Sequence, residues 1–286
     1  MNGQSNGTVL TVGASVIWGT SFVATSVGLQ YSNPYVLLFE RFFVATIAIL
    51  VLGIFSSSAR IWRELRRPRT WAIAGVYAVA FLLQFVGQDA SGASASALLS
   101  NLFVVFVPIA AFFVLGERVP NSSKVAVALG VVGIVLVLPS GFQITGTTLG
   151  DLMLVGASAG YTLFIVLGKK YNVSSLASSF GIIVSMTVIV APLAAFEGGP
   201  FALSGLGAAT DWESVLWLGV PCTVVALAMF TRGLASTRAV QSATLLLLEI
   251  IIGLALSALL LGNVLSLTQA TGAGVIALAI ILTSRQ

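Results

Sequence analysis

The chain has 286 residues, of which 58% are hydrophobic and only 8% charged, and its mean hydropathy is +1.07. Soluble domains carry about a quarter of charged residues, so this composition indicates an integral membrane protein. With no histidine and one cysteine, Cys222, we expect no histidine-based metal or catalytic site and no internal disulfide. The net charge of +4 is spread over short loops, and we attribute it to membrane topology rather than to nucleic-acid binding.

Ten apolar runs are long enough, at about 1.5 Å per residue of helix, to cross a hydrocarbon core about 30 Å thick. Lipid offers no partner for backbone amides, and the runs lack the short alternation of a barrel, so we predict helices. The start, Met1 to Gly7, is polar and uncharged, which does not fit a cleavable signal peptide. The predicted helices cover residues 8–29, 34–56, 71–89, 93–115, 122–139, 150–169, 174–196, 213–235, 238–261 and 266–284, and the longest predicted loop covers 57–70.

The basic residues fall on one side of this topology. If the N-terminus is cytoplasmic, all of the 13 lysines and arginines except Arg41 lie in even-numbered loops or at the C-terminus. The opposite loops contain none, but they contain Glu197, Asp211 and Glu213. This is the bias of the positive-inside rule. We therefore predict a multi-pass protein of a prokaryotic inner (plasma) membrane with both termini in the cytoplasm.

A weak internal repeat runs through the chain at a spacing of 143 to 146 residues. Gly13-Ala14-Ser15 and Trp18 recur as Gly156-Ala157-Ser158 and Tyr161, and a second set recurs in the same way: Ala97, Leu99, Leu102, Leu115 and Gly116 as Ala243, Leu245, Leu248, Leu261 and Gly262. Each copy holds five helices, an odd number, so the second copy enters the membrane from the opposite side. We predict an all-α integral membrane protein of ten transmembrane helices in two inverted five-helix repeats, residues 1–140 and 141–286.

Inverted repeats are the architecture of secondary transporters, because two such halves can exchange conformations and open a central cavity to either side. The chain has no P-loop motif and no soluble region long enough to bind ATP. Transport is therefore driven by a gradient or runs downhill. No nucleophile, base or metal cluster is assembled, so we expect neither an enzyme nor a cofactor. A channel is an alternative that would show far faster flux and no counter-transport.

Three charged residues lie inside predicted helices: Glu40, Arg41 and Glu249. Charges at such depth normally face a partner or a watery cavity. Glu40 and Arg41 are adjacent, so they diverge by about 100° and at least one needs another partner. Arg41 is either a clamp between helices or a ligand for a substrate carboxylate. Glu249, near the midplane, suits a proton or ammonium site; the alternative is a structural contact, for example to Arg41.

Polar and aromatic side chains supply the remaining candidates for a cavity. Serine often bonds its own backbone, and aromatic stripes, such as Tyr77, Phe81 and Phe85, often pack or face lipid, because periodicity does not choose the inner face. Gln84 and Asn101 have amides that could bind both ends of an amino acid. The predicted cavity residues are Trp18, Ser21, Phe22, Gln84, Gln88, Ser100, Asn101, Tyr161, Trp217 and Gln241.

The chain resembles the drug/metabolite transporter superfamily, and within it the ten-helix EamA-type branch. The residues that carry the resemblance are Trp18-Gly19 with Phe22, Pro34 with Arg41, Gln84 with Gly87, Ala95 to Leu99 through Pro108 to Gly116-Glu117-Arg118, Gly130 and Gly133, Gly150-Asp151-Leu152, and Leu248-Glu249. The chain departs from the family pattern in having Glu249-Ile250 instead of Glu-Pro and Gly262-Asn263 instead of Gly-Glu. The first departure puts a proline-kinked gate in the ninth helix in doubt.

The resemblance implies a transporter of small molecules with a central cavity formed by helices 1, 3, 4, 6, 8 and 9, and we expect a monomer. It favours export of apolar or aromatic amino acids, or of related compounds, by alternating access. The alternative is efflux of cationic drug-like molecules in exchange for protons, which Glu249 would support. In both cases the partners are a small-molecule substrate and the lipid bilayer, with protons added in the second.

Overall fold

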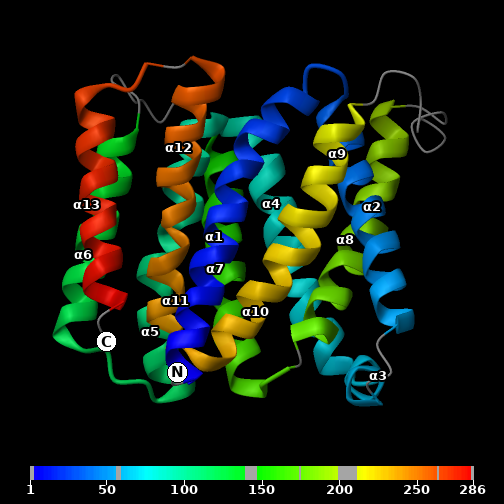
Figure 1. The fold of residues 1–286 in the computed structure, drawn as a ribbon, viewed down its shortest axis with the longest axis horizontal. Helices are drawn as coiled ribbons and strands as arrows, with labels where there is room; N and C mark the ends of the chain where they lie inside the picture. Colours follow the sequence, from blue (N-terminus) through cyan, green and yellow to red (C-terminus); the bar gives the residue numbers. More distant parts are fainter. Residues whose placement is uncertain are drawn as a thin grey trace.

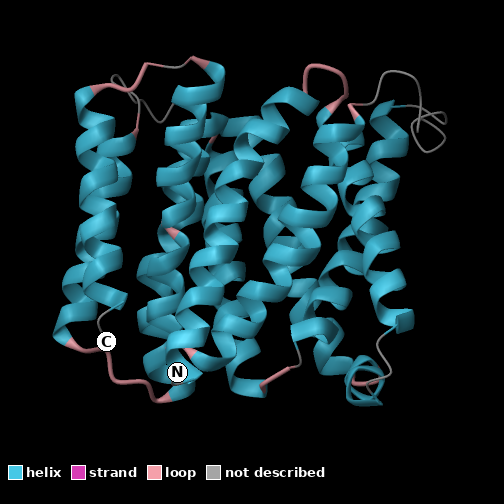
Figure 2. Ribbon diagram, in the orientation of Figure 1, coloured by secondary structure: helices cyan, strands magenta, loops and turns pink. Residues whose placement is uncertain are grey.

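The structure is a computed structural model that describes residues 3–55, 59–138, 147–173, 175–198, 211–262 and 264–284. Every regular element within these ranges is a helix, and none is a strand (Figure 2). Nine of the described helices are long and apolar enough to cross a membrane, and a tenth, Asn121–Val137, is apolar but shorter. The predicted fold class, all-α with ten transmembrane helices, is therefore confirmed.

The elements follow one another in Figure 1 as α1 (Gly3–Gly28), α2 (Pro34–Phe55), α3 (Ala59–Leu65), α4 (Pro68–Leu99), η1 (Ser100–Leu102), α5 (Phe103–Leu115), α6 (Asn121–Val137), α7 (Thr148–Tyr171), α8 (Ser175–Gly198), α9 (Trp212–Gly219), η2 (Val220–Val225), α10 (Ala226–Ser236), α11 (Ala239–Leu246), α12 (Leu248–Leu261) and α13 (Leu267–Ser284). Here η1 is a 3₁₀ turn and η2 is a π-helix.

Three of the spans are interrupted. The fourth begins at the end of α4 and continues through η1 into α5, the eighth consists of α9, η2 and α10, and the ninth is divided at Leu247 between α11 and α12. The ninth helix thus breaks without the proline that the family pattern places there. The prediction of a plain loop over 57–70 is wrong in one respect, because α3, the sequence Ala-Arg-Ile-Trp-Arg-Glu-Leu, forms a short helix within it.

The first and last helices place the two ends of the chain together. In Figure 1, α1 begins and α13 ends at the same end of the bundle, where α3 also lies. An even number of spans requires this arrangement. That this end faces the cytoplasm stays a prediction. The charge argument uses Glu197, whose side chain is outside the described ones, and Arg285, which lies outside the described residues.

The helix packing reproduces the predicted repeat. The first helix of each half packs on the other half's third span: α1 contacts α10, and α7 contacts α4. The first helix of each half also packs on the second part of the other half's fourth span: α1 packs on α12, in the ninth span of the chain, and α7 packs on α5, in the fourth. Two pairs match like with like, α2 with α8 and α6 with α13. Each of these contacts therefore has a counterpart in which the two halves exchange roles, or joins equivalent helices, as expected for inverted repeats.

Glycines mark this exchange at the level of single residues. A Cβ at Gly233 would lie 2.8 Å from the carbonyl oxygen of Gly7, and a Cβ at Gly87 would lie 2.9 Å from that of Gly150. The spacing from Gly7 to Gly150 is 143 residues and that from Gly87 to Gly233 is 146, the same two spacings that define the sequence repeat. The two contacts are thus one close helix crossing, made twice.

The repeat also extends to helix ends. Gly116 ends α5 with φ +67°, and Gly262 ends α12 with φ +70°. This left-handed conformation favours glycine and closes the last helical turn. The two positions are 146 residues apart, so the Gly-Glu and Gly-Asn turns that close the fourth and ninth spans have the same backbone structure at the glycine.

Candidate functional site

A cavity lies between the two halves, near the middle of the bundle. It encloses about 230 Å³ of space, solvent included. We call it the arginine cavity, after its one charged lining residue, and it is lined by Trp18, Arg41, Phe42, Tyr77, Phe81, Ile182, Cys222, Thr223 and Leu227. The lining residues belong to α1, α2, α4, α8, η2 and α10, so both halves of the chain contribute to it.

Arg41 enters this cavity from α2. Its Nε donates a hydrogen bond of 2.8 Å to Oγ1 of Thr223. The guanidinium carbon lies 5.5 Å from the ring centre of Phe42 and 5.8 Å from that of Phe81, which is the range of cation–π contacts. No carboxylate of the described residues lies within ion-pair distance of Arg41. A guanidinium has five N–H donors, and the described residues accept a hydrogen bond from one of them.

The partner of Arg41 is positioned by the π-helix η2. Pro221 has no backbone N–H, which favours such a local widening of a helix. The Thr223 hydroxyl donates to the carbonyl oxygen of Leu218, five residues earlier, at 2.8 Å, and accepts the bond from Arg41. The widened turn therefore fixes the hydroxyl that orients the guanidinium. π-helical turns of this kind are frequent at functional sites.

Aromatic rings form a continuous cluster around the cavity. The ring centres of Tyr77 and Tyr161 are 5.5 Å apart, and those of Tyr77 and Phe164 are 4.8 Å apart. Phe230 extends the cluster to Trp18, at 5.5 Å. These rings come from α1, α4, α7 and α10. Tilted and edge-on pairs at such distances give the cavity apolar walls.

Trp18 and Tyr161, which coincide in the sequence repeat, make equivalent bonds across the two halves. Trp18 Nε1 donates to the carbonyl oxygen of Cys222 at 2.7 Å. Tyr161 donates its hydroxyl to Oε1 of Gln84 at 2.5 Å. Each bond joins the first helix of one half to the third span of the other. The sequence repeat therefore identified two residues with the same structural role.

Glu249 lies in the first turn of α12, just beyond the break at Leu247. Its carboxylate makes no hydrogen bond or ion pair with the described residues, so the alternative of a contact to Arg41 is not borne out there. Both Arg41 and Glu249 lie close enough to Tyr77 and Tyr161 to interact with them electrostatically. A positive and a negative group thus approach the same two tyrosines from different helices.

Most of the other polar candidates are occupied by the protein itself. Ser21 donates to the carbonyl oxygen of Trp18, and Asn101 to that of Ala97. Gln88 accepts from the hydroxyl of Ser96. These bonds are local, which for Ser21 is the structural alternative weighed for serine; Asn101, favoured as a substrate ligand for its amide, also bonds the backbone of its own helix turn. None of these three residues lines the arginine cavity.

Two further polar candidates are buried away from the arginine cavity. Gln241 donates to Oγ1 of Thr8, while its own Oε1 has no partner among the described residues. Ser100 is buried in η1, and its hydroxyl has no partner there either. Glu40 is 2% exposed and does not line the cavity, although it is next to Arg41. The divergence of adjacent helical residues explains this difference.

Phe22 and Trp217 do not line the cavity. They are 54% and 46% exposed on the helix bundle. The ring of Phe22 covers Gly253, and Trp217 Nε1 donates to Oγ1 of Thr20. Seven residues that line the cavity were not selected from the sequence. Tyr77 and Phe81 could have been found, because their spacing of four on the third helix places them on one face. No sequence pattern pointed to the other five, Phe42, Ile182, Cys222, Thr223 and Leu227. The second and seventh helices, absent from the implied cavity set, contribute lining residues.

The fold and the cavity define a class: a multi-pass membrane transporter built from two inverted repeats around a polar site. Comparison with known proteins gives the family. Residues 5–138 and 148–285 each match the model of the EamA-like transporter family, and the chain belongs to that family. This confirms the resemblance to the drug/metabolite transporter superfamily. The expectation that the protein is no enzyme agrees with the family in general terms, because a transporter is in general not an enzyme.

Two curated relatives have similar extent. An uncharacterized transporter of Archaeoglobus fulgidus is 26% identical over 237 residues, which cover 77% of each chain. The uncharacterized transporter YetK of Bacillus subtilis is 23% identical over 246 residues, covering 82% of this chain and 74% of the relative. A solved crystal structure matches with a TM-score of 0.82 at 16% identity, over 98% of this chain and 99% of that one. The last comparison supports the fold.

Proposed function

We propose that the chain is a secondary transporter that exports apolar or aromatic amino acids, or related carboxylates, by alternating access. The observation that carries the proposal is Arg41, a cation in the middle of the bundle that has a hydroxyl and two rings around it but no carboxylate among the described residues. Buried charges are normally paired. A carboxylate on the substrate would complete the pair, in the fork geometry that guanidinium groups favour.

The walls of the arginine cavity support an apolar or aromatic side chain on that substrate. Trp18, Phe42, Tyr77 and Phe81 face it together with Ile182 and Leu227. Small-molecule sites commonly combine such walls with one or two polar anchors. Glu249, near the two tyrosines, provides the negative charge that the ammonium group of an amino acid requires. A zwitterion with an aromatic body matches this set of groups.

In this proposal residues 1–140 and 141–286 act as the two lobes, and the monomer lies in the plasma membrane with both chain ends in the cytoplasm. The second candidate function, efflux of cationic drug-like molecules in exchange for protons, is supported by the carboxylate of Glu249, which has no partner among the described residues. Arg41 counts against it, because a cation in the same small cavity repels a cationic substrate. The carboxylate-bearing substrate is therefore the better fit.

The test is a counterflow assay in liposomes containing the purified protein, with radiolabelled phenylalanine and with phenethylamine, which lacks the carboxylate. Arg41→Gln should reduce phenylalanine counterflow at least about 30-fold, since losing one partner of a buried charge pair costs about 2 kcal/mol or more. Arg66→Gln, an exposed arginine outside the cavity, is the matched control. Equal handling of both compounds, or no effect of Arg41→Gln, would refute the proposal. Flux without counterflow would indicate a channel.

A further inference from the structure

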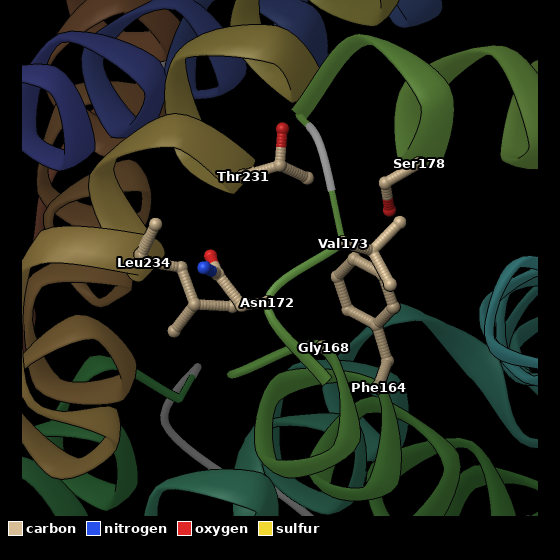
Figure 3. A pocket seen from close by; sticks show the side chains of 8 residues that line it. Phe164, Gly168, Asn172, Val173, Ser178, Thr231 and Leu234 are labelled. Carbon is tan, nitrogen blue, oxygen red and sulfur yellow. The ribbon is translucent and has the colours of Figure 1, made fainter. Parts of the chain in front are cut away.

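A second cavity lies beside the arginine cavity, towards the end of the bundle at which the chain begins and ends. It encloses about 310 Å³, solvent included, between α7, the turn after it, α8 and α10 (Figure 3). We call it the outer cavity. The lining residues that matter for its role are Phe164, Gly168, Asn172, Ser178 and Thr231. None of the predicted site residues lines it, and the family match assigns it no function.

The two cavities follow the same faces of the same two helices. On α8, Ser178 lines the outer cavity and Ile182 the arginine cavity. On α10, Thr231 lines the outer cavity and Leu227 the arginine cavity, and the hydroxyl of Thr231 donates to the carbonyl oxygen of Leu227 at 2.8 Å. Residues four apart share a helix face and lie about 6 Å apart along the axis. The lining residues of the two cavities are therefore one helical turn apart on both α8 and α10.

Phe164 lies between the two cavities. Its ring lines the outer cavity and lies 4.8 Å from the ring of Tyr77, which lines the arginine cavity. On the other side the ring centre of Phe230 is 6.4 Å away. Gly168, one turn further along α7, leaves space open in the outer cavity, because the atom nearest to a Cβ there would be Leu234 Cδ2 at 3.9 Å. The side chain of Phe164 thus lies between the two spaces.

The polar groups of the outer cavity suit a carboxylate. Ser178 is 5% exposed and makes no hydrogen bond with the described residues, and its hydroxyl points toward Val173 at the cavity (Figure 3). It lies in the first turns of α8, a 24-residue helix that begins at Ser175. The first amide N–H groups of a helix lack partners within it and attract anions. Asn172, whose φ is 46°, adds an amide at the mouth.

We propose that the outer cavity is a second substrate subsite, on the route between the surface and Arg41, with Phe164 as the gate between the two. It takes the same class of compound, a small carboxylate with an apolar side chain, held by neutral donors and thus more weakly than at the guanidinium. This inference rests on the proposed function, because it requires the same substrate to pass. The loosely held substrate waits there until the Phe164 ring turns.

The experiment places a cysteine at Ser178 and, as a matched control, at Ser179. The control residue is the next one on α8, is fully buried and does not line the outer cavity. The native chain, with its buried Cys222, is treated in parallel. Phenylalanine counterflow is measured before and after treatment with a small, charged, membrane-impermeant thiol reagent applied to either side. The labelling rate is measured with and without phenylalanine.

Labelling of Ser178→Cys should lower its counterflow at least about tenfold, the kinetic equivalent of about 1.4 kcal/mol, and phenylalanine should slow the labelling. Ser179→Cys and the native chain should be unaffected. If Ser178→Cys is labelled without loss of counterflow, or is not labelled, the subsite is refuted while the proposed function stands. If the native chain neither binds nor transports phenylalanine, the proposed function fails. Thr231→Cys serves as the second position should Ser178→Cys not fold.

Discussion

Glu117 and Lys169, from opposite halves of the chain, form an ion pair of 3.7 Å. Glu117 follows the cap of α5 and also accepts a hydrogen bond of 3.2 Å from the backbone N–H of Ala239. Lys169, in the last turn of α7, also donates to the carbonyl oxygen of Thr237. The pair thus ties the ends of the fourth and sixth spans to the turn between the eighth and ninth.

The sequence supplies the residues of this ion pair at one end of the bundle but not at their repeat-related positions. The repeat spacings of 146 and 143 residues place Asn263 opposite Glu117 and Ser26 opposite Lys169, and both are neutral. An ion pair on one side only stabilises the state that is closed there, while the opposite closure has no such pair. The ion pair therefore biases the equilibrium between the two conformations by about its own free energy, about 1 kcal/mol for a partly exposed pair.

Glu117→Gln should therefore favour opening at the end of the bundle where the two chain ends lie. A cysteine at Ser242, which is buried in α11 and bonded to Thr237 in this structure, should react about fivefold faster with a thiol reagent, as about 1 kcal/mol requires. Lys170→Gln, which removes an exposed neighbouring charge with no ion pair among the described residues, should leave the rate unchanged. An unchanged or slower rate in Glu117→Gln would exclude the role of the pair.

The close contact between α6 and α13 allows a prediction of how much the protein is destabilised when a glycine there is replaced by alanine. A Cβ at Gly272 would lie 2.8 Å from the carbonyl oxygen of Gly133, and one at Gly133 would lie 3.0 Å from that of Gly272. Both clashes are with backbone, so Gly133→Ala and Gly272→Ala should each destabilise the protein by about 1–3 kcal/mol. Melting temperatures in detergent measure this. Gly274→Ala on the same helix meets nothing within 4 Å and should not lower the melting temperature; equal losses in all three would contradict the packing.

The position of the Glu249 carboxyl group leads to a prediction of how transport depends on pH. If its carboxyl exchanges protons during the cycle, Glu249→Gln should abolish transport or remove the change of phenylalanine flux with pH in proteoliposomes. Glu213→Gln, at the start of α9 and outside the cavity, is the control and should retain the native profile. Flux in Glu249→Gln that equals native flux at every pH would leave the carboxylate with a structural role alone.

The sequence predicted the helices well, because hydropathy over about 20 residues reports directly on the cost of placing backbone and side chains in lipid. It did not predict the break at Leu247, which has no proline, or the helix α3, which is too short and too charged to be found by hydropathy. The π-helix η2 was not predicted either, although it contains Pro221, whose missing backbone N–H favours a local widening of the helix.

For the cavity, the outcome depended on the kind of evidence. Trp18 and Tyr161 were selected by the repeat, and the structure gives them equivalent bonds. Phe22 was selected by its spacing from Trp18, yet it is exposed, because periodicity defines a helix face but not its neighbour. Arg41 was recognised by the cost of its charge. Its actual partner, Thr223, is 182 residues away, a distance that a single sequence does not bridge.

The measurement that tests the central claim most directly is a structure of the protein determined with an aromatic amino acid bound. The account predicts that the carboxylate of the ligand lies in ionic contact with the guanidinium of Arg41, with its ring against Trp18, Phe42 or Phe81. A ligand bound elsewhere while Arg41 stays without an anionic partner would contradict it, and so would a bound cationic compound paired with Glu249 in the absence of any carboxylate at Arg41.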